Sequence, residues 1–181
     1  IGSKGVIKKV AYEVIGYMLK EENNVYRSRW KEYTLYNPQE GFAFLSEYSG
    51  HWTFVKERGD APVLEKEHVD SFTYAEEPFQ LFNKYSFEVI NSVGEFPYNV
   101  FNDYDKNVKE FISPPEIWIQ EKSAKEGIIW YHGEHIDRNE LQKAFGEGIV
   151  LPEKTGVGAV EPKGFVNPYK IASVAFMAAL I

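Results

Sequence analysis

Hydrophobic and polar residues alternate along much of the chain, and no long window repeats its hydrophobic residues with the helical period of about 3.6 positions. Segments rich in β-branched and aromatic residues lie at 10–19, 25–36, 42–48 and 51–56. Turn residues separate them, with Pro38 and Gly41 in one turn and Ser49 and Gly50 in a tight hairpin. Short strands at this spacing predict an antiparallel sheet that is closed or doubled on itself.

A second set of predicted strands follows a polar excursion. Residues 57–78 are polar and charged, and we interpret them as a connection. The strands expected after this connection lie at 79–82, 85–93, 98–101, 116–122 and 127–133. Pro114 and Pro115 interrupt regular pairing just before the fourth of these strands. The sequence therefore predicts a first β unit over residues 1–56 and a second over residues 79–149.

The two β units resemble each other in sequence. The segment YEVI at 12–15 is similar to FEVI at 87–90, and FLSE at 44–47 is similar to WIQE at 118–121. Glu13 precedes Glu47 by 34 positions, and Glu88 precedes Glu121 by 33 positions. We interpret this as a pseudo-repeat of two β-meander or barrel-like units packed face to face. The alternative is chance similarity between β-rich segments.

One short helix is predicted near residues 138–145, at the end of the second β unit. Asp137 is suited to cap its start, and Glu140 follows three residues later, which is the acidic form of a capping box. Gly146 is suited to end it. Because the helix is short, it must be stabilised by packing on the second β unit.

The C-terminal part of the sequence changes character twice. Residues 150–170 are dense in proline and glycine, which is typical of an extended linker. Residues 171–181 carry no charge and are either a short helix or strand packed on the body or the start of a truncated transmembrane helix. A membrane span needs about 20 apolar residues. Lys163 and Lys170 precede the segment, so the membrane reading places the folded body on the cytoplasmic face.

Composition excludes several classes of site. The chain has 181 residues, 44% of them hydrophobic, and no cysteine, which excludes a thiol nucleophile, a Cys-ligated zinc site and an iron–sulfur cluster. A net charge of −7 argues against binding of nucleic acid, because phosphate neutralisation needs clustered cations. Arg27, Arg29 and Lys31 form a local positive stripe, interpreted as a solvated outer face, with contact to an anion or an acidic partner as the alternative.

A set of motifs in a fixed order identifies a possible family. The motifs are IGSKGVI at 1–7, YEVIG at 12–16, WKEYTLY at 30–36, FLSEYSGHW at 44–52, VGEFPY at 93–98, PPE at 114–116 and WYHGEHIDRNELQKAF at 130–145. With them the chain resembles the bacterial family known as domain of unknown function 4178 over nearly the whole body. The resemblance implies no assigned activity and no catalytic residues. Some similar proteins carry membrane helices behind the domain, a layout that agrees with the position of the apolar segment at 171–181.

Four residues are candidates for ligand binding. Glu47 and Glu121 lie in otherwise apolar strands at equivalent places of the two units, where a facing pair would form an acid–base pair or a cation site. The alternative is that they face water, as polar residues of antiparallel strands commonly do. Trp52 and Trp130 are expected mainly in the core, with a groove for a peptide or small ligand as the alternative.

The histidines do not form a metal-binding pattern. His132 and His135 are three positions apart, so they point to opposite faces of an extended strand. With His51 as a further histidine and no cysteine, we expect no native metal site. The glycine-rich stretches at 146–148 and 156–158 complete no nucleotide-binding pattern, and no cofactor is expected.

Two functions from different classes follow from these observations. The first is a non-catalytic module that binds another protein by a strand edge or a groove and is tethered to the membrane. The second is an enzyme or small-molecule sensor with a pocket between the two β units, using Glu47 or Glu121, with a cationic ligand. A deep, apolar-walled cleft with a buried carboxylate favours the second function, and a filled core with a flat acidic exterior favours the first.

Overall fold

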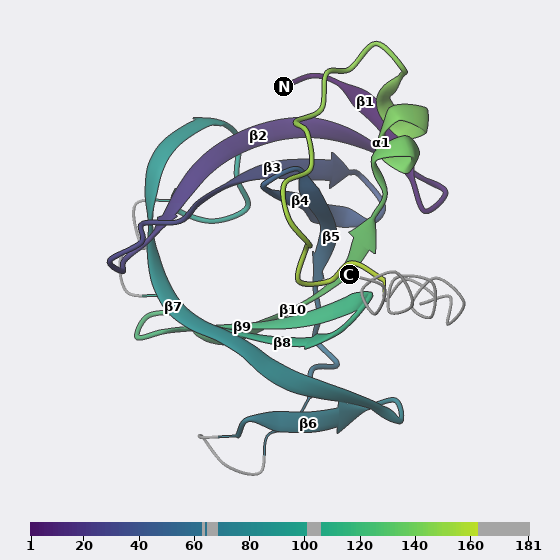
Figure 1. Cartoon of the computed structure of the whole chain (residues 1–181). Coiled ribbons are helices and arrows are strands. Elements are labelled where there is room, and N and C mark those ends of the chain that lie inside the picture. Colours follow the sequence, from purple (N-terminus) through teal and green to yellow (C-terminus); the bar gives the residue numbers. More distant parts are fainter. Residues whose placement is uncertain (63, 65–68, 101–105, 163–181) are drawn as a thin grey trace, which may run out of the picture.

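The computed structural model describes residues 1–62, 64, 69–100 and 106–162. Its main feature is a closed antiparallel barrel, which Figure 1 shows as a ring of curved strands. The barrel strands follow the order β2, β3, β4, β5, β10, β9, β8 and β7, and β7 pairs with β2 to close the ring. β1 extends the sheet beyond β2, and β6 extends it beyond β7. The predicted fold class, mainly antiparallel β with one short C-terminal helix, is confirmed.

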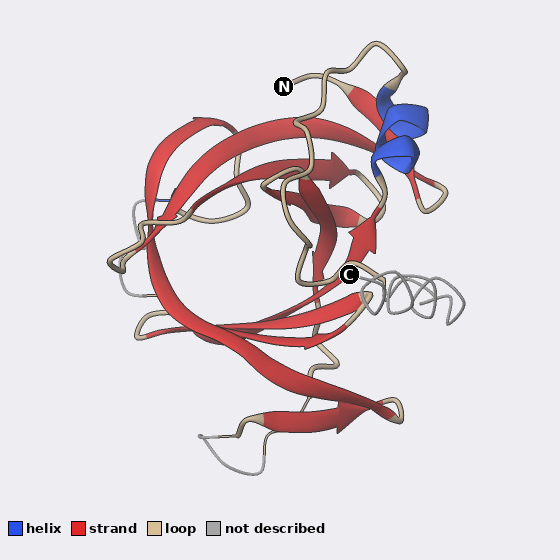
Figure 2. Ribbon diagram, in the orientation of Figure 1, coloured by secondary structure: helices blue, strands red, loops and turns tan. Residues whose placement is uncertain are grey.

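Strands make up nearly all of the regular structure (Figure 2). They are β1 (Lys4–Ile7), β2 (Val10–Glu22), β3 (Arg29–Asn37), β4 (Gly41–Tyr48), β5 (His51–Glu57), β6 (Ser71–Tyr74), β7 (Glu77–Gly94), β8 (Asn107–Ser113), β9 (Glu116–Ser123) and β10 (Gly127–Ile136). Alternate residues of each barrel strand point inward and outward, so a single strand contributes to both sides of the wall.

The two predicted meanders are the two halves of this one barrel. β2–β5 form the first half and β7–β10 the second, and they face each other across the barrel interior. Hydrogen-bonded pairing of β5 with β10 and of β2 with β7 joins the halves along both edges. The halves therefore share one wall and one interior.

The predicted strands differ from the structure in several places. The strand expected at 98–101 does not form, since none of residues 95–100 is in a strand and residue 101 lies outside the described residues. β8 and β6 were not predicted, because β8 (NVKEFIS) is short and polar at one end and β6 lies in the polar excursion. The segments expected at 79–82 and 85–93 form one long strand, β7, with a register shift between Leu81 and Asn83.

A first hydrophobic core lies outside the barrel wall, beneath the helix α1 (Arg138–Phe145) and β1. We call it the helix-side core, and its buried members are Ile7, Tyr12, Val14, Leu35, Ala43, Leu45, Trp52, Phe54, Ile136, Leu141 and Leu151. The predicted helix is confirmed: the Asp137 side chain accepts a hydrogen bond from the Asn139 backbone, and the helix ends at Gly146. The prediction that it packs on the second β unit is wrong, because Leu141 packs mainly with residues of β1–β5. Gly5 brings β1 close to α1, because a Cβ there would lie 2.6 Å from the Phe145 ring.

A second hydrophobic core lies outside the opposite part of the wall, beneath β6. We call it the β6-side core, and its buried members are Phe79, Phe111, Trp118 and Trp130. Phe72 and Tyr74 of β6 cover it, with the Phe72 ring 5.0 Å from that of Phe111 and the Tyr74 ring 4.7 Å from that of Trp118. The excursion expected at 57–78 therefore contributes a strand that closes this core.

Residues 150–162 contain no helix or strand, as expected for a segment rich in proline and glycine. They nevertheless pack on the barrel, because Leu151 and Val160 are buried and Arg138 donates hydrogen bonds to the carbonyls of Leu151 and Pro152. His51 Nε2 donates a further hydrogen bond to the Thr155 carbonyl oxygen at 3.1 Å. The described part of the predicted linker is thus an ordered strap across one end of the barrel.

None of the helices among the described residues has the length and hydropathy needed to cross a membrane. The apolar segment predicted at 171–181 lies outside the described residues.

Candidate functional site

The barrel encloses a cavity of about 550 Å³. Its walls contain residues of all eight barrel strands, so it is the interior of the barrel itself. The side chains that line it from these strands include Lys20, Glu22, Trp30, Glu32, Phe44, Ser46, Thr53, Val55, Tyr85, Phe87, Glu110, Ile117, Ile119, Glu121 and Tyr131. A volume in this range suits a small organic ligand.

Residues from the connections between strands line both ends of the cavity. Strand register places Tyr26, Tyr48 and Phe82 at one end, and each of these side chains is more than half exposed. Residues 158–160 of the strap lie at the same end, beside His51. Tyr98, in the connection between β7 and β8, lies at the other end, where its hydroxyl is 3.3 Å from Oε1 of Glu32.

Aromatic rings form one wall of the cavity. Trp30 of β3 lies edge-on to two rings of β7, with ring centroids 5.7 Å from Tyr85 and 5.5 Å from Phe87. On the facing side, Phe44 lies edge-on to Tyr131 at 6.0 Å. Such rings present both an apolar surface and the negative π face that attracts cations.

Two buried lysines pair with carboxylates that line the cavity, and one of them, Lys20, lines the cavity itself. Lys20 Nζ lies 2.9 Å from Glu32 Oε1 and 4.7 Å from the centre of the Phe87 ring. Lys106 Nζ lies 3.2 Å from Glu121 Oε2 and 4.7 Å from the centre of the Tyr98 ring. Burial raises the pKa of Glu121, while Lys20 and Lys106 act to lower it.

Glu110 is the carboxyl whose environment is most unusual. It lies in the middle of β8, and the Tyr85 hydroxyl donates a 2.8 Å hydrogen bond to its Oε1. Burial raises the pKa of Glu110 to about 7, the bond from Tyr85 acts to lower it, and the charge of Glu22 raises it further. Glu110 therefore exchanges a proton near neutral pH, which is the property of a general acid or base as well as of a switchable anion.

Glu22 lies close to Glu110 across the β2–β7–β8 part of the wall. Asn83, which pairs with Glu110 in the register of β7 and β8, donates a 3.4 Å hydrogen bond to Glu22 Oε1. The Asn24 amide donates to the other oxygen of Glu22. The donors to this carboxylate are thus neutral amides.

Of the predicted candidates, only Glu121 lines the cavity. Glu47 lies on the outer side of the wall, where its Oε1 accepts a 2.8 Å hydrogen bond from the Gly50 backbone and its Oε2 pairs with Lys31 at 2.9 Å. Trp52 is part of the helix-side core and Trp130 of the β6-side core. The structure therefore does not bring Glu47 and Glu121 together.

Sequence reasoning missed Lys20, Glu22, Trp30, Tyr85 and Glu110 as cavity residues. One signal was present: Lys20, Glu22 and Glu110 alternate with other residues in strands that are otherwise half-buried, so each had an inward or an outward orientation. Only barrel closure decides between the two orientations, because it turns one face of every strand toward a common interior.

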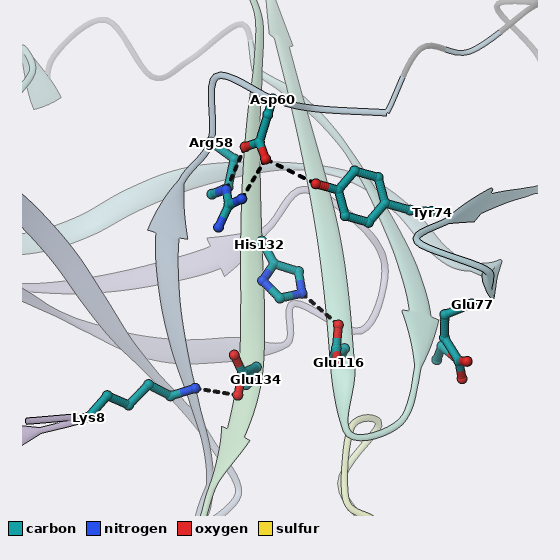
Figure 3. Close-up of polar contacts among 9 residues, drawn as sticks. Lys8, Arg58, Asp60, Tyr74, Glu77, Glu116, His132 and Glu134 are labelled. Carbon is teal, nitrogen blue, oxygen red and sulfur yellow. Dashed lines mark hydrogen bonds and ion pairs between the residues drawn. The ribbon is translucent and has the colours of Figure 1, made fainter.

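Of the three histidines considered from the sequence, His51 lines one end of the cavity, whereas His132 and His135 are not among its lining residues. On the outer face of β10, His132 Nε2 lies 2.9 Å from Glu116 Oε2, and its ring packs at 4.8 Å from that of Trp118 (Figure 3). Figure 3 also shows Arg58 and Asp60 joined by two hydrogen bonds, to which Tyr74 of β6 adds a third at 3.0 Å. These contacts fasten β6 and its preceding loop to the barrel.

The predicted positive stripe is compensated by acidic residues. Arg27 and Arg29 both donate to the buried Glu21 carboxylate, and Lys31 pairs with Glu47. The hydrogen bond from Arg29 is the main cause that lowers the pKa of Glu21. The stripe is therefore largely an intramolecular ion-pair network on the outer wall.

Comparison with known protein families identifies the family to which this chain belongs. A family model described as Domain of unknown function (DUF4178) matches residues 1–138. These residues include all ten strands and end at the start of α1. No curated protein and no solved structure shows significant similarity to the chain.

Proposed function

The chain belongs to the DUF4178 family, a domain of unknown function, and we propose that its barrel is a non-catalytic module that binds a small molecule in the interior. The observation that carries this proposal is the 550 Å³ cavity with aromatic walls. Eight-stranded barrels are wide enough either to be filled by side chains or to hold one small ligand. Here the two larger cores lie outside the wall, and the interior holds a smaller cluster of Phe44, Val55 and Tyr131 beside the open cavity.

Exposed rings beside the cavity also support binding. Tyr26, Tyr48 and Phe82 keep apolar surface in water at one end of the cavity. Their exposure costs solvation free energy that a bound apolar group recovers in part.

A neutral apolar dye tests the proposal. Nile red becomes brighter in apolar surroundings, and we expect saturable binding of one dye per chain. Ser46 lines the middle of the cavity, so Ser46→Phe fills the interior and is expected to weaken dye binding at least about tenfold, or 1.4 kcal/mol.

The matched control is Ser71→Phe, which places the same ring on the exposed edge strand β6. Dye binding that Ser46→Phe leaves unchanged would place the dye outside the barrel and contradict the proposal. Circular dichroism of both variants checks that the barrel still forms.

Protein binding stays a second candidate. β1 and β6 end the sheet order, so each presents one edge without a paired strand among the described residues. Such edges can accept an added strand from a partner. Membrane tethering on the cytoplasmic face, which depends on residues 171–181, stays a prediction that full-length expression and membrane fractionation can test.

A further inference from the structure

The cavity contains a repeated arrangement for holding an ammonium group. Lys20 is held by the Glu32 carboxylate and the Phe87 ring, and Lys106 by the Glu121 and Glu126 carboxylates and the Tyr98 ring. In both cases a carboxylate neutralises the charge while the π face of a ring replaces part of its hydration. A carboxylate together with an aromatic ring is therefore the arrangement that stabilises a buried ammonium group in this protein.

A third set of the same groups holds no lysine. The Glu22 and Glu110 carboxyl groups lie beside the aromatic wall of Trp30 and Tyr85. Their donors are the amides of Asn24 and Asn83 and the Tyr85 hydroxyl, and within the described ranges neither carboxyl has a cationic partner. Two acidic groups in one enclosed interior repel each other, which leaves this place suited to a positive charge.

The Tyr131 hydroxyl is a further polar group on the cavity wall that a ligand can contact. Tyr131 is only 7% exposed and lines the interior, yet its hydroxyl has no hydrogen-bond partner in the described part of the chain. The hydroxyl is not one of the fully buried polar atoms that lack a partner among the described residues, so it is accessible within the cavity and can hydrogen-bond a ligand there. Its ring packs against Phe44, which fixes its position in the wall.

We propose that the ligand of this cavity is an amine with an apolar body, whose protonated nitrogen binds between Glu22 and Glu110 beside the Trp30 ring. This inference rests on the proposed small-molecule binding and adds the chemical class of the ligand. The apolar body lies against the aromatic wall, and a polar atom at its far end reaches Tyr131. An anionic ligand is disfavoured, because four carboxyl groups and two paired lysines meet at this interior.

The test compares two probes of the same shape. Phenethylamine and phenethyl alcohol differ in the replacement of an ammonium by a hydroxyl, and the amine stays protonated at about pH 8, since alkyl ammonium groups have a pKa of about 10. By calorimetry on the whole chain, we expect the amine to bind at least about tenfold more tightly than the alcohol. Glu110→Gln and Glu22→Gln are each expected to reduce that ratio to below about threefold.

Glu134→Gln, on the outer face of β10 beside Lys8, is the matched control and should leave the ratio unchanged. If a cavity variant fails to fold, the wild-type chain alone still decides, because amine affinity should rise from about pH 6 to about pH 8 while alcohol affinity stays constant. Equal affinity for the two probes overturns the amine inference and leaves small-molecule binding intact. Absence of binding by either probe overturns the inference, and only a simultaneous failure of Nile red to bind overturns the proposed function as well.

Discussion

The Tyr85 hydroxyl donates a 2.8 Å hydrogen bond to Oε1 of Glu110 inside the barrel. Tyr85 lies in β7 and Glu110 in the neighbouring β8, so the hydrogen bond links the two strands on the cavity side of the wall. It acts to lower the pKa of Glu110 against the larger effect of burial, which raises that pKa to about 7. The pair therefore couples protonation of the interior to the stability of the fold.

The first prediction concerns this coupling. The folded-state pKa of Glu110, about 7, lies above its ordinary value of 4.5, so the folded chain retains a proton that the unfolded chain releases. Stability contributed by this group is present below about pH 4.5 and is lost as the pH rises to about 7, with a total near 3 kcal/mol. Glu110→Gln should therefore be more stable than wild type at pH 8 by up to about 3 kcal/mol, and similar to it at about pH 4.

Urea unfolding at the two pH values measures this difference. Glu134→Gln serves as the control, because it changes the same type of residue on the outer face. A difference between Glu110→Gln and wild type that is equal at both pH values would mean that the carboxyl titrates normally in the fold.

The second prediction separates Glu47 from the cavity. Its carboxylate is 5% exposed and holds both the Gly50 backbone and Lys31. Glu47→Ala leaves a buried N–H without an acceptor and removes the charge partner of Lys31, so we expect a loss of about 2–4 kcal/mol in the free energy of unfolding. Nile red affinity should not change, since Glu47 lies on the outer side of the wall.

Glu13→Ala is the comparison for this variant. Glu13 pairs with Lys4 at 3.4 Å, with its side chain 43% exposed, and its loss should cost less than about 1 kcal/mol. A similar cost for both variants, or a loss of dye binding in Glu47→Ala, would refute the assignment of Glu47 to a purely structural contact.

The order and type of most strands follow from local patterning, and their inward and outward orientation does not. The similar segments at 12–15 and 87–90 show this, because Tyr12 packs in the helix-side core while Phe87 lines the cavity. The segments at 44–47 and 118–121 also differ in orientation, since Phe44 lines the cavity and Trp118 lies in the β6-side core. The pseudo-repeat itself stays a prediction.

The sequence does not reveal which residues of a strand point inward, because both faces of the barrel wall are rich in apolar residues. In a sheet with one wet face, a polar residue marks that face. Here Glu47 is polar on the outer side and Glu121 is polar on the inner side, and each is neutralised by a lysine from another strand or connection. Which lysine meets which glutamate depends on register shifts such as that between Val14 and Gly16, which the sequence pattern does not reveal.

The third prediction concerns the attachment of the strap at 150–162. Gly158 lies against His51, and a Cβ at this position would be 2.7 Å from the imidazole Nδ1. Gly158→Ala should therefore displace the strap while the barrel strands stay intact. Hydrogen exchange followed by mass spectrometry should show faster exchange in 150–162 and unchanged exchange in β2–β5.

Gly148→Ala provides the control within the same part of the chain. No atom lies within 4 Å of a Cβ at Gly148, so this substitution should leave exchange in the strap unchanged. Slow exchange in the strap of Gly158→Ala would show that the contact with His51 does not hold it.

The last prediction uses the four tryptophans as probes of the interior. Trp52, Trp118 and Trp130 are at most 8% exposed and belong to the two outer cores, whereas Trp30 is half-buried and lines the cavity. Acrylamide is small enough to enter the barrel, so it should quench mainly Trp30. Trp30→Phe should then remove most of the acrylamide quenching, and saturating phenethylamine should protect wild type to a similar extent.

Trp52→Phe is the control, because its indole N–H has no hydrogen-bond partner among the described residues and its loss removes an outer-core ring only. Quenching that persists in Trp30→Phe and disappears in Trp52→Phe would show that solvent reaches the helix-side core more readily than the barrel interior, which an open cavity does not allow.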